Sequence, residues 1–168
     1  DSNGVVKDAG GDAGALNLSA VNGTVSQSGT LLGTALLAAD SNGVYRKGGK
    51  LSVDAQNAQD LAALASRLAA QEDAAGVLRN FGGTLSLRNR SGSQTLAEGV
   101  TLKSANVALT TDSGKLTING TINADGAQGG KVSLSAAVSD AKQTALELGS
   151  TASITARAQQ LSTATTAY

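Results

Sequence analysis

Hydrophobic and polar residues alternate in short stretches along most of this chain, and a glycine precedes each stretch. Lys115-Leu116-Thr117-Ile118 follows Gly114, and Lys131-Val132-Ser133-Leu134 follows Gly130. A two-residue period is typical of a β-strand with one buried face. The pattern therefore predicts an all-β chain of short strands, each with an aliphatic inner face and a polar outer face.

The glycine-led stretch returns at nearly constant spacing. Such glycines stand at positions 14, 33, 49, 83, 99, 114, 130 and 149, and only the step from 49 to 83 is about twice as long as the others. Self-similarity at a short period indicates a repeat fold, and helix-pair repeats need roughly 33–47 residues per unit. We therefore expect each of these shorter units to form one coil of a β-solenoid. Eight coils stacked in parallel about 4.8 Å apart would form a rod of about 38 Å.

The alternation also predicts which side chains fill the interior, while the Ser, Thr, Asn and Lys residues between them are expected to face water. The expected interior consists of Leu16, Leu18, Leu51, Val53, Leu85, Leu87, Val100, Leu102, Val107, Leu109, Leu116, Ile118, Ile122, Val132, Leu134, Val138 and Ile154. Three asparagines, Asn89, Asn119 and Asn123, are expected to stack as a polar ladder at one corner of the coils.

One segment, residues 57–80, breaks the pattern, because Ala, Leu, Gln and Arg replace Gly, Ser and Thr. Its apolar residues follow helical spacing at Leu61, Leu64, Ala65 and Leu68. We expect an inserted α-helix at about residues 57–76, of about four turns, packed on the side of the stack. Asn57, followed three residues later by Asp60, is the candidate N-cap. Docking of another domain or chain is the alternative role.

The composition fits a thin aliphatic core. Hydrophobic residues make up 40% of the chain but aromatic residues only 2%, and there are 21 glycines and no proline. Without Cys or His, the chain has no disulfides, no thiolate metal ligands and no imidazole base. Thirteen basic and thirteen acidic residues cancel, which argues against nucleic acid as a partner. We expect no cofactor, no metal site and no membrane insertion.

Few residues stand out as candidates for chemistry. Tyr45, Arg46 and Lys47 form a basic, aromatic turn, and Arg88 and Arg90 follow an expected strand on its outer side. These five are candidate surface contacts for a sugar or a protein partner, and solvated rim residues are the plainer interpretation. The carboxylates are scattered, without pairs at matching coil positions: Asp54, Glu98, Asp112, Asp125, Asp140 and Glu147. The chain is therefore predicted not to be an enzyme, and a β-helix enzyme acting on polysaccharides is the weaker alternative.

Outward threonines raise a third possibility, a flat ligand-binding face. Thr84, Thr101, Thr117 and Thr121 occupy expected outward positions, but they share these positions with Ser, Lys and Asn. A regular Thr-x-Thr array is missing, which argues against ice binding. Glycan contact as part of adhesion stays open.

Several stretches resemble the repeats of filamentous haemagglutinin-like exoproteins, the secreted partners of bacterial two-partner secretion systems. These stretches run from Gly82 to Asn89, from Gly114 to Gly126 and from Gly129 to Leu134. The resemblance implies a right-handed parallel β-helix in a long extracellular fibre at the cell surface. It also implies export through a dedicated outer-membrane pore partner, and binding to a host receptor, a glycan or the biofilm matrix. The family offers no catalytic residue to carry over.

The resemblance also bears on where this segment belongs. The secretion domain of that family carries Asn-Pro motifs, whereas this chain has no proline, which favours an interior or distal rod segment. We expect residues 1–168 to form one solenoid segment of a longer fibre, interrupted by the insert at 57–80. The predicted function is a structural and adhesive rod in attachment, aggregation or biofilm formation. The stalk of a contact-dependent toxin delivery protein is the alternative.

Overall fold

The computed structural model describes residues 12–35, 48–69, 80–126 and 129–158. These residues are mostly β-structure with one helix, α1 (Leu61–Ala69). The expected contact residues Tyr45, Arg46 and Lys47 lie outside the described residues, as do residues 70–79 of the expected insert. The predicted class, a mostly-β chain of parallel sheets with one inserted helix, is therefore confirmed for the described residues.

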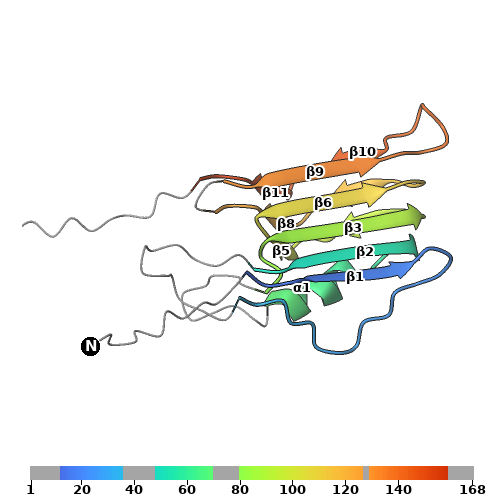
Figure 1. Cartoon of the computed structure of the whole chain (residues 1–168). Coiled ribbons are helices and arrows are strands. Elements are labelled where there is room, and N and C mark those ends of the chain that lie inside the picture. The colour runs from blue at the N-terminus through green and yellow to red at the C-terminus, as the bar shows by residue number, and fades with distance from the viewer. Residues whose placement is uncertain (1–11, 36–47, 70–79, 127–128, 159–168) are drawn as a thin grey trace, which may run out of the picture.

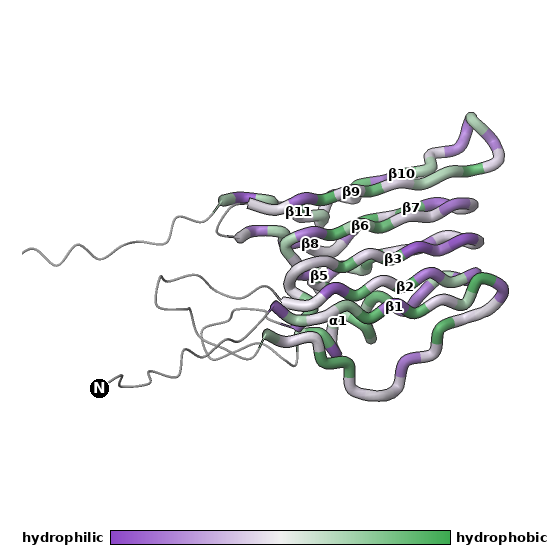
Figure 2. The backbone as a smooth tube through the Cα atoms, viewed as in Figure 1, coloured by the Kyte–Doolittle hydropathy of each residue, from purple (hydrophilic) through white to green (hydrophobic). Residues whose placement is uncertain are grey.

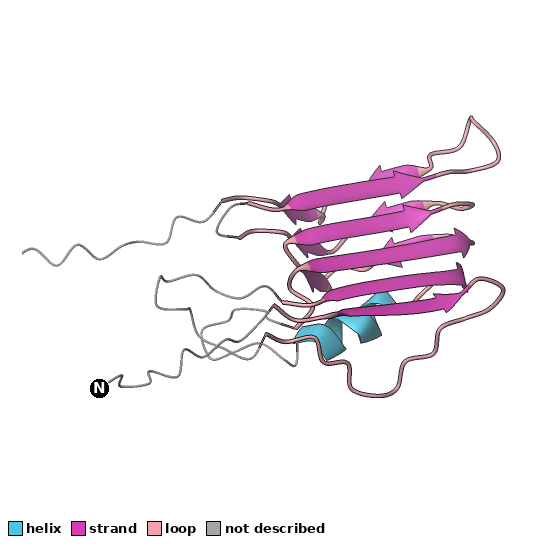
Figure 3. Ribbon diagram, viewed as in Figure 1, coloured by secondary structure: helices cyan, strands magenta, loops and turns pink. Residues whose placement is uncertain are grey.

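The strands form three parallel sheets (Figures 1 and 3). The largest sheet contains, in spatial order, β1 (Ala15–Ala20), β2 (Lys50–Asn57), β3 (Thr84–Ser91), β6 (Asn106–Thr111) and β9 (Lys131–Ala136). The second contains β10 (Leu146–Leu148), β7 (Leu116–Ile118) and β4 (Gln94–Leu96). The third contains β11 (Ser153–Thr155), β8 (Thr121–Asn123) and β5 (Thr101–Lys103). Every strand pair in these sheets is parallel.

From β3 onward the chain visits the three sheets in turn, and this order corrects the predicted period. Leu85 of the largest sheet pairs with Val107, and Val107 in turn pairs with Val132. The chain thus returns to the same sheet only after a stretch longer than the predicted repeat unit. The predicted length of the repeat was therefore wrong. The glycine step fails as a period because successive glycines lead strands of different sheets. Gly114 precedes β7 of the second sheet, for example, and Gly130 precedes β9 of the largest.

The predicted length is corrected with the period. Five strands in the largest sheet span four intervals, or about 19 Å along the stacking direction at about 4.8 Å each. The predicted rod was about twice as long. The strands of this sheet reach eight residues, about 26 Å at about 3.3 Å per residue. The described part is therefore no longer along the stack than it is wide.

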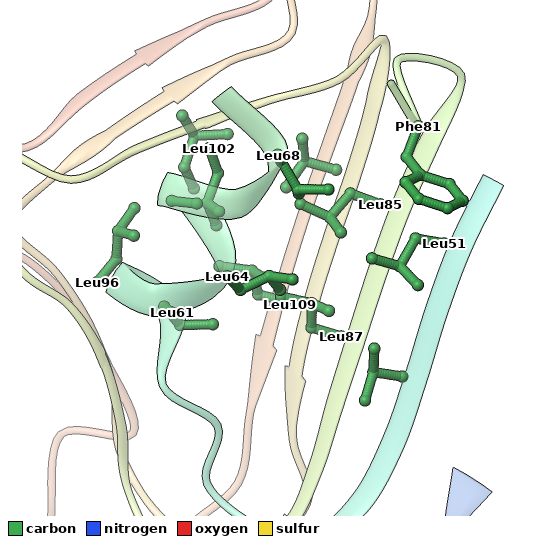
Figure 4. Close-up of a cluster of buried hydrophobic side chains, with 14 of the residues drawn as sticks. Leu51, Leu61, Leu64, Leu68, Phe81, Leu85, Leu87, Leu96, Leu102 and Leu109 are labelled. Atoms are coloured by element: carbon green, nitrogen blue, oxygen red, sulfur yellow. The ribbon is translucent and has the colours of Figure 1, made fainter. Parts of the chain in front are cut away.

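The interior is the aliphatic core that the alternation predicts (Figure 4). Hydrophobic and hydrophilic residues follow one another along the strands (Figure 2). Most of the predicted inward residues are fully buried: Leu51, Val53, Leu85, Leu87, Leu102, Val107, Leu109, Leu116, Ile118 and Ile122. Others lie nearer the two ends of the sheets or at a corner and are only partly buried against this core: Leu16, Leu18, Val100, Val132 and Leu134. Val138 is half-buried. Ile154 is the exception, because its side chain is exposed at the last strand of its sheet.

The predicted helix is confirmed in its buried face and corrected in its bounds and place. Leu61, Leu64, Ala65 and Leu68 are all buried. Asn57 is the last residue of β2, and Asp60 is the N-cap, since its carboxylate accepts a hydrogen bond of 2.9 Å from the Ala63 backbone N–H. The helix contacts β4 and β5, the edge strands of the two smaller sheets. It therefore covers one end of those sheets and their core rather than the outer side (Figure 4).

The predicted asparagine ladder is wrong. Asn89 lies in the largest sheet, Asn119 follows β7 of the second sheet, and Asn123 ends β8 of the third. Two of them bond locally instead: the buried Asn89 amide donates to the Gly92 carbonyl at 2.6 Å, and Asn123 Oδ1 accepts from the Asp125 N–H at 2.9 Å. Asn89 and Asn123 therefore fix separate turns, as short polar side chains often do.

Candidate functional site

The outer face of the largest sheet carries a cluster of four charged side chains, Asp54, Arg88, Arg90 and Asp112, which we call the charged row. Asp54 of β2 and Arg88 of β3 are register partners, and Asp112 follows β6 directly. Arg90 donates two hydrogen bonds to the Asp54 carboxylate, at 2.7 and 2.8 Å. Arg88 Nε donates to the two carboxylate oxygens of Asp112 at 2.9 and 3.2 Å, and Arg88 Nη2 lies 2.7 Å from Asp112 Oδ2. Two arginine forks thus each engage a carboxylate on a neighbouring strand.

Electrostatics within the charged row follow from these contacts. The hydrogen bonds from Arg90 lower the pKa of Asp54, and the nearby positive charges of Arg90 and Arg88 act in the same direction. The pKa of the Arg90 guanidinium is raised, chiefly by its hydrogen bonds to Asp54. Arg88 Nη1 also lies 4.0 Å from Asp54 Oδ2, so its charge links the two pairs. Two positive and two negative charges balance, and the row ties three neighbouring strands together.

These ion pairs bear on Arg88 and Arg90, two of the candidate surface contacts that the sequence indicates. Arg88 and Arg90 both lie at the outer face, as the sequence indicates, but their guanidinium groups are engaged by carboxylates. An anionic ligand would have to displace Asp54 or Asp112 to reach them. Sequence reasoning missed these partners because Asp54 lies far before Arg88 in the chain, and the two meet only once the strands are placed in register.

Two further carboxylates that the sequence singles out, Asp125 and Glu147, make similar contacts between distant parts of the chain, whereas Asp140 accepts a local hydrogen bond from the Lys142 N–H at 2.9 Å. Glu147 of β10 forms an ion pair with Lys115, which precedes β7. Asp125 accepts hydrogen bonds from the Arg157 backbone N–H at 2.7 Å and from Arg157 Nη2 at 2.8 Å. The side-chain hydrogen bonds of Arg157, followed by its backbone N–H, lower the pKa of Asp125. Ion pairs therefore recur where the chain passes the same place again.

Two carboxylates do come together, which the sequence did not indicate. Asp54 and Asp112 both face Arg88, on either side of it. Glycoside hydrolysis requires two carboxyl groups that face a bound sugar, one of them protonated near neutral pH. The hydrogen bonds of Asp54 instead favour its charged form, since its pKa is lowered. In the described residues no group of three or more acidic, His or Cys side chains is placed to hold a metal ion.

A polar groove of about 400 Å³ lies at the corner between the largest and second sheets. It is lined mainly by small hydroxyl and amide side chains and by Lys115: Ser93, Ser113, Gly114, Lys115, Val138, Ser139, Gln143 and Thr144. Inside the same corner, Gln94 and Thr111 are buried, and their side-chain polar atoms have no hydrogen-bond partner among the described protein groups. The corner thus places buried polar side chains beside a mainly aliphatic interior.

The threonines of the possible flat ligand-binding face are divided among the three sheets. Thr101 and Thr121 are register partners in the third sheet, whereas Thr117 lies in the second and pairs with Thr95. Thr84 lies in the largest sheet, beside Lys50. These short rows do not add up to one flat threonine surface.

The last strands of the three sheets, β9, β10 and β11, together form what we call the open end. Their inward residues continue the core rows, since Leu146 pairs with Leu116, Leu148 with Ile118 and Ile154 with Ile122. The residues of β7 and β8 in these rows are fully buried, but Leu146, Leu148 and Ile154 are 39%, 56% and 38% exposed. No described strand pairs with the outer edge of these three strands. The open end therefore leaves apolar side chains and backbone hydrogen-bonding groups without a partner among the described residues.

Comparisons with protein-family models, with curated proteins and with solved structures found no match to this chain. No helix among the described residues combines the length and hydropathy needed to cross a bilayer. The functional interpretation therefore rests on the geometry above: outer faces bound by ion pairs, one polar groove and one open end.

Proposed function

We propose that the chain is a segment of a β-solenoid and serves as a structural and adhesive rod in a large secreted bacterial surface adhesin. The observation that carries the proposal is the order in which the chain visits the sheets: β3, β4, β5, then β6, β7, β8, then β9, β10, β11. A return to three sheets in a fixed order, in parallel register each time, is the order that a winding chain would follow, and this supports the proposal. We infer a right-handed winding because parallel crossovers are right-handed in about 98% of cases.

The energetics of such a winding suit a mechanical element. Each passage of the chain buries aliphatic side chains against the passage before it and hydrogen-bonds to it along every strand, so stability is a sum over neighbouring contacts. The cross-strand ion pairs, such as Arg88 with Asp112 and Arg157 with Asp125, add ties between successive passages. Length is then gained by adding passages, without any change of the core.

The character of the outer surface supports a binding rather than a catalytic role. The outward residues of the largest sheet are small and mostly polar along a central row: Asn17, Ser52, Ser86, Ala108 and Ser133. Such a surface lets a glycan or protein approach closely and offers hydrogen bonds. In the proposed setting the full protein leaves the cell through an outer-membrane pore partner and meets a host receptor, a glycan or the biofilm matrix.

A bead assay tests the adhesive role. Polystyrene beads coated with the purified full chain are incubated with cultured epithelial cells and with biofilm matrix, and attached beads are counted. The matched control is the same chain unfolded in urea before coating, at equal surface density. We expect attachment by the folded chain to exceed the control several-fold. Equal attachment by folded and unfolded chains on both targets would contradict the adhesive role.

A further inference from the structure

The chain contains four asparagines that are directly followed by glycine, a pair that is chemically labile in water. The backbone nitrogen of the glycine attacks the side-chain amide carbon of the asparagine before it, and glycine hinders this attack least because it has no Cβ. Two of these pairs, Asn22-Gly23 and Asn119-Gly120, lie among the described residues. They offer the same chemistry in two different surroundings, so the structure decides which of them reacts.

Asn22-Gly23 lies in a turn that directly follows β1. Asn22 is exposed, and the Gly23 N–H donates to the Ala20 carbonyl at 3.0 Å within the same turn. A Cβ at Gly23 would meet no atom within 4 Å, so the backbone has open space in which to rotate. The hydrogen bond to Ala20 must open before the Gly23 nitrogen reaches the Asn22 side chain, and openings confined to an exposed turn cost little free energy.

Asn119-Gly120 connects β7 to β8 and is held on the neighbouring strands. The Gly120 N–H donates to the Leu96 carbonyl of β4 at 3.0 Å, and the Asn119 N–H donates to the same carbonyl at 2.8 Å. Gly120 is buried, and a Cβ there would collide with the carbonyl oxygens of Ala97 and Val100. The backbone of this pair therefore rotates only after it separates from the chain packed against it, which is a larger opening than that of an exposed turn.

We propose that Asn22 is a deamidation site of the folded chain and that strand packing protects Asn119 from the same reaction. The Gly23 nitrogen gives up its proton to hydroxide and forms a bond to Asn22 Cγ, and the bond from Cγ to the side-chain nitrogen breaks to release ammonia. One water molecule then opens the resulting five-membered imide at either of its two carbonyls. Opening at one carbonyl yields aspartate. Opening at the other yields isoaspartate, whose main chain runs through the side-chain carbons.

The modification acts on a contact between the turn and the largest sheet. The Gly23 carbonyl accepts a hydrogen bond of 2.9 Å from the Gln56 N–H, near the end of β2. Isoaspartate at position 22 lengthens the main chain by one atom just before this contact, and both products add a negative charge. We expect the isoaspartate product to weaken the contact, so that the Gln56 amide exchanges its hydrogen with solvent faster. The reaction does not depend on the adhesive role.

Peptide mapping by mass spectrometry tests the proposal on the full chain after incubation in a mildly alkaline buffer. Conversion is followed at Asn22 and Asn119, both in the folded chain and in the chain unfolded in guanidinium chloride. We expect similar rates at the two asparagines in the unfolded chain. In the folded chain Asn22 should keep a rate within a few-fold of its unfolded rate. Asn119 should react at least about tenfold more slowly than when unfolded, since its ring forms only after local unfolding.

Gly23→Ala is the matched variant, because a Cβ there meets no atom within 4 Å and the Gly23 backbone is not in the left-handed region. The added methyl group shields the nitrogen, so we expect the reaction at Asn22 to slow several-fold while the rate at Asn119 stays unchanged. Far-UV circular dichroism checks that the variant is folded.

Three results would overturn the proposal. The first is protection of Asn22 in the folded chain as strong as that of Asn119. The second is a rate at Asn119 that folding does not slow. The third is an unchanged rate at Asn22 in the Gly23→Ala variant. An aspartate-specific protease separates the two products, since it cuts before aspartate at position 22 but not before isoaspartate.

Discussion

Leu116→Ala and Leu146→Ala apply one substitution to one inward row, at a covered and at an uncovered position. The two leucines are register partners in β7 and β10. Leu116 is fully buried, whereas Leu146 is 39% exposed because no described strand follows β10 in its sheet. The pair therefore isolates the effect of covering one strand with the next.

The magnitudes follow from burial and cavity formation. Leu→Ala at a fully buried site costs about 3–5 kcal/mol, because the lost transfer energy and the remaining cavity add. We expect about 3 kcal/mol for Leu116→Ala. At Leu146 a large part of the side chain is already in water and no closed cavity forms, so we expect about 1 kcal/mol. The difference of about 2 kcal/mol corresponds to roughly 4–8 °C in Tm for a chain of this size.

Urea unfolding followed by far-UV circular dichroism measures both costs, because the chain has no tryptophan to report by fluorescence. The measurement is made in dilute solution and compared at equal m-value, so that a shift of the midpoint reports stability alone. Equal costs at the two positions, or a cost under about 1 kcal/mol at Leu116, would refute the assignment of this row to a core that each further strand closes.

Three further predictions follow from single contacts. Asp125→Asn should reduce the loss of stability in acid, because the pKa of Asp125 is lowered in the folded chain. Its stabilising contribution is complete above the ordinary carboxyl pKa and disappears as the pH falls through the lowered value. Thermal melts of the variant with an unchanged dependence of stability on acid pH would contradict this. Asp60→Ala should cost about 1 kcal/mol in urea unfolding through loss of the α1 N-cap, and a cost near zero would argue against the cap. Gly114→Ala should cost about 2–4 kcal/mol, because its φ of 144° and the adjoining Gly92 carbonyl leave no room for a Cβ. The control Gly14→Ala, whose Cβ would meet no atom within 4 Å, should stay within about 0.5 kcal/mol. Similar melting temperatures for the two variants would show that the corner at Gly114 tolerates a side chain.

The interior could be predicted from the sequence because strand alternation is a local signal. Leu85 and Leu87, or Leu116 and Ile118, reveal their buried face through nothing more than the residue between them. The helical face of α1 was equally local, since Leu61, Leu64 and Leu68 share one side at helical spacing.

Features that depend on distant residues could not be predicted in the same way. The glycine spacing reports where a strand begins, but it does not say which sheet the strand joins, and so the period came out too short. The pairing of Arg88 with Asp112 depends on the register between β3 and β6. The place of α1 at one end of the smaller sheets depends on which strands lack a neighbour, which appears only in the assembled sheets.

Disulfide trapping tests the winding of the chain most directly, because the chain has no cysteine of its own. Double-cysteine variants are made at outward register partners, one pair in each sheet: Ser86 with Ala108, Thr95 with Thr117, and Thr101 with Thr121. Neighbouring parallel strands lie about 4.8 Å apart, within disulfide reach, whereas the control pair Ser86 with Ser133 spans two intervals, about 9.6 Å, which exceeds it. Mild oxidation is followed by non-reducing mass analysis of the monomer fraction. Winding predicts an intrachain disulfide in all three register pairs and none in the control, and failure in any one sheet, or a disulfide in the control, would contradict it.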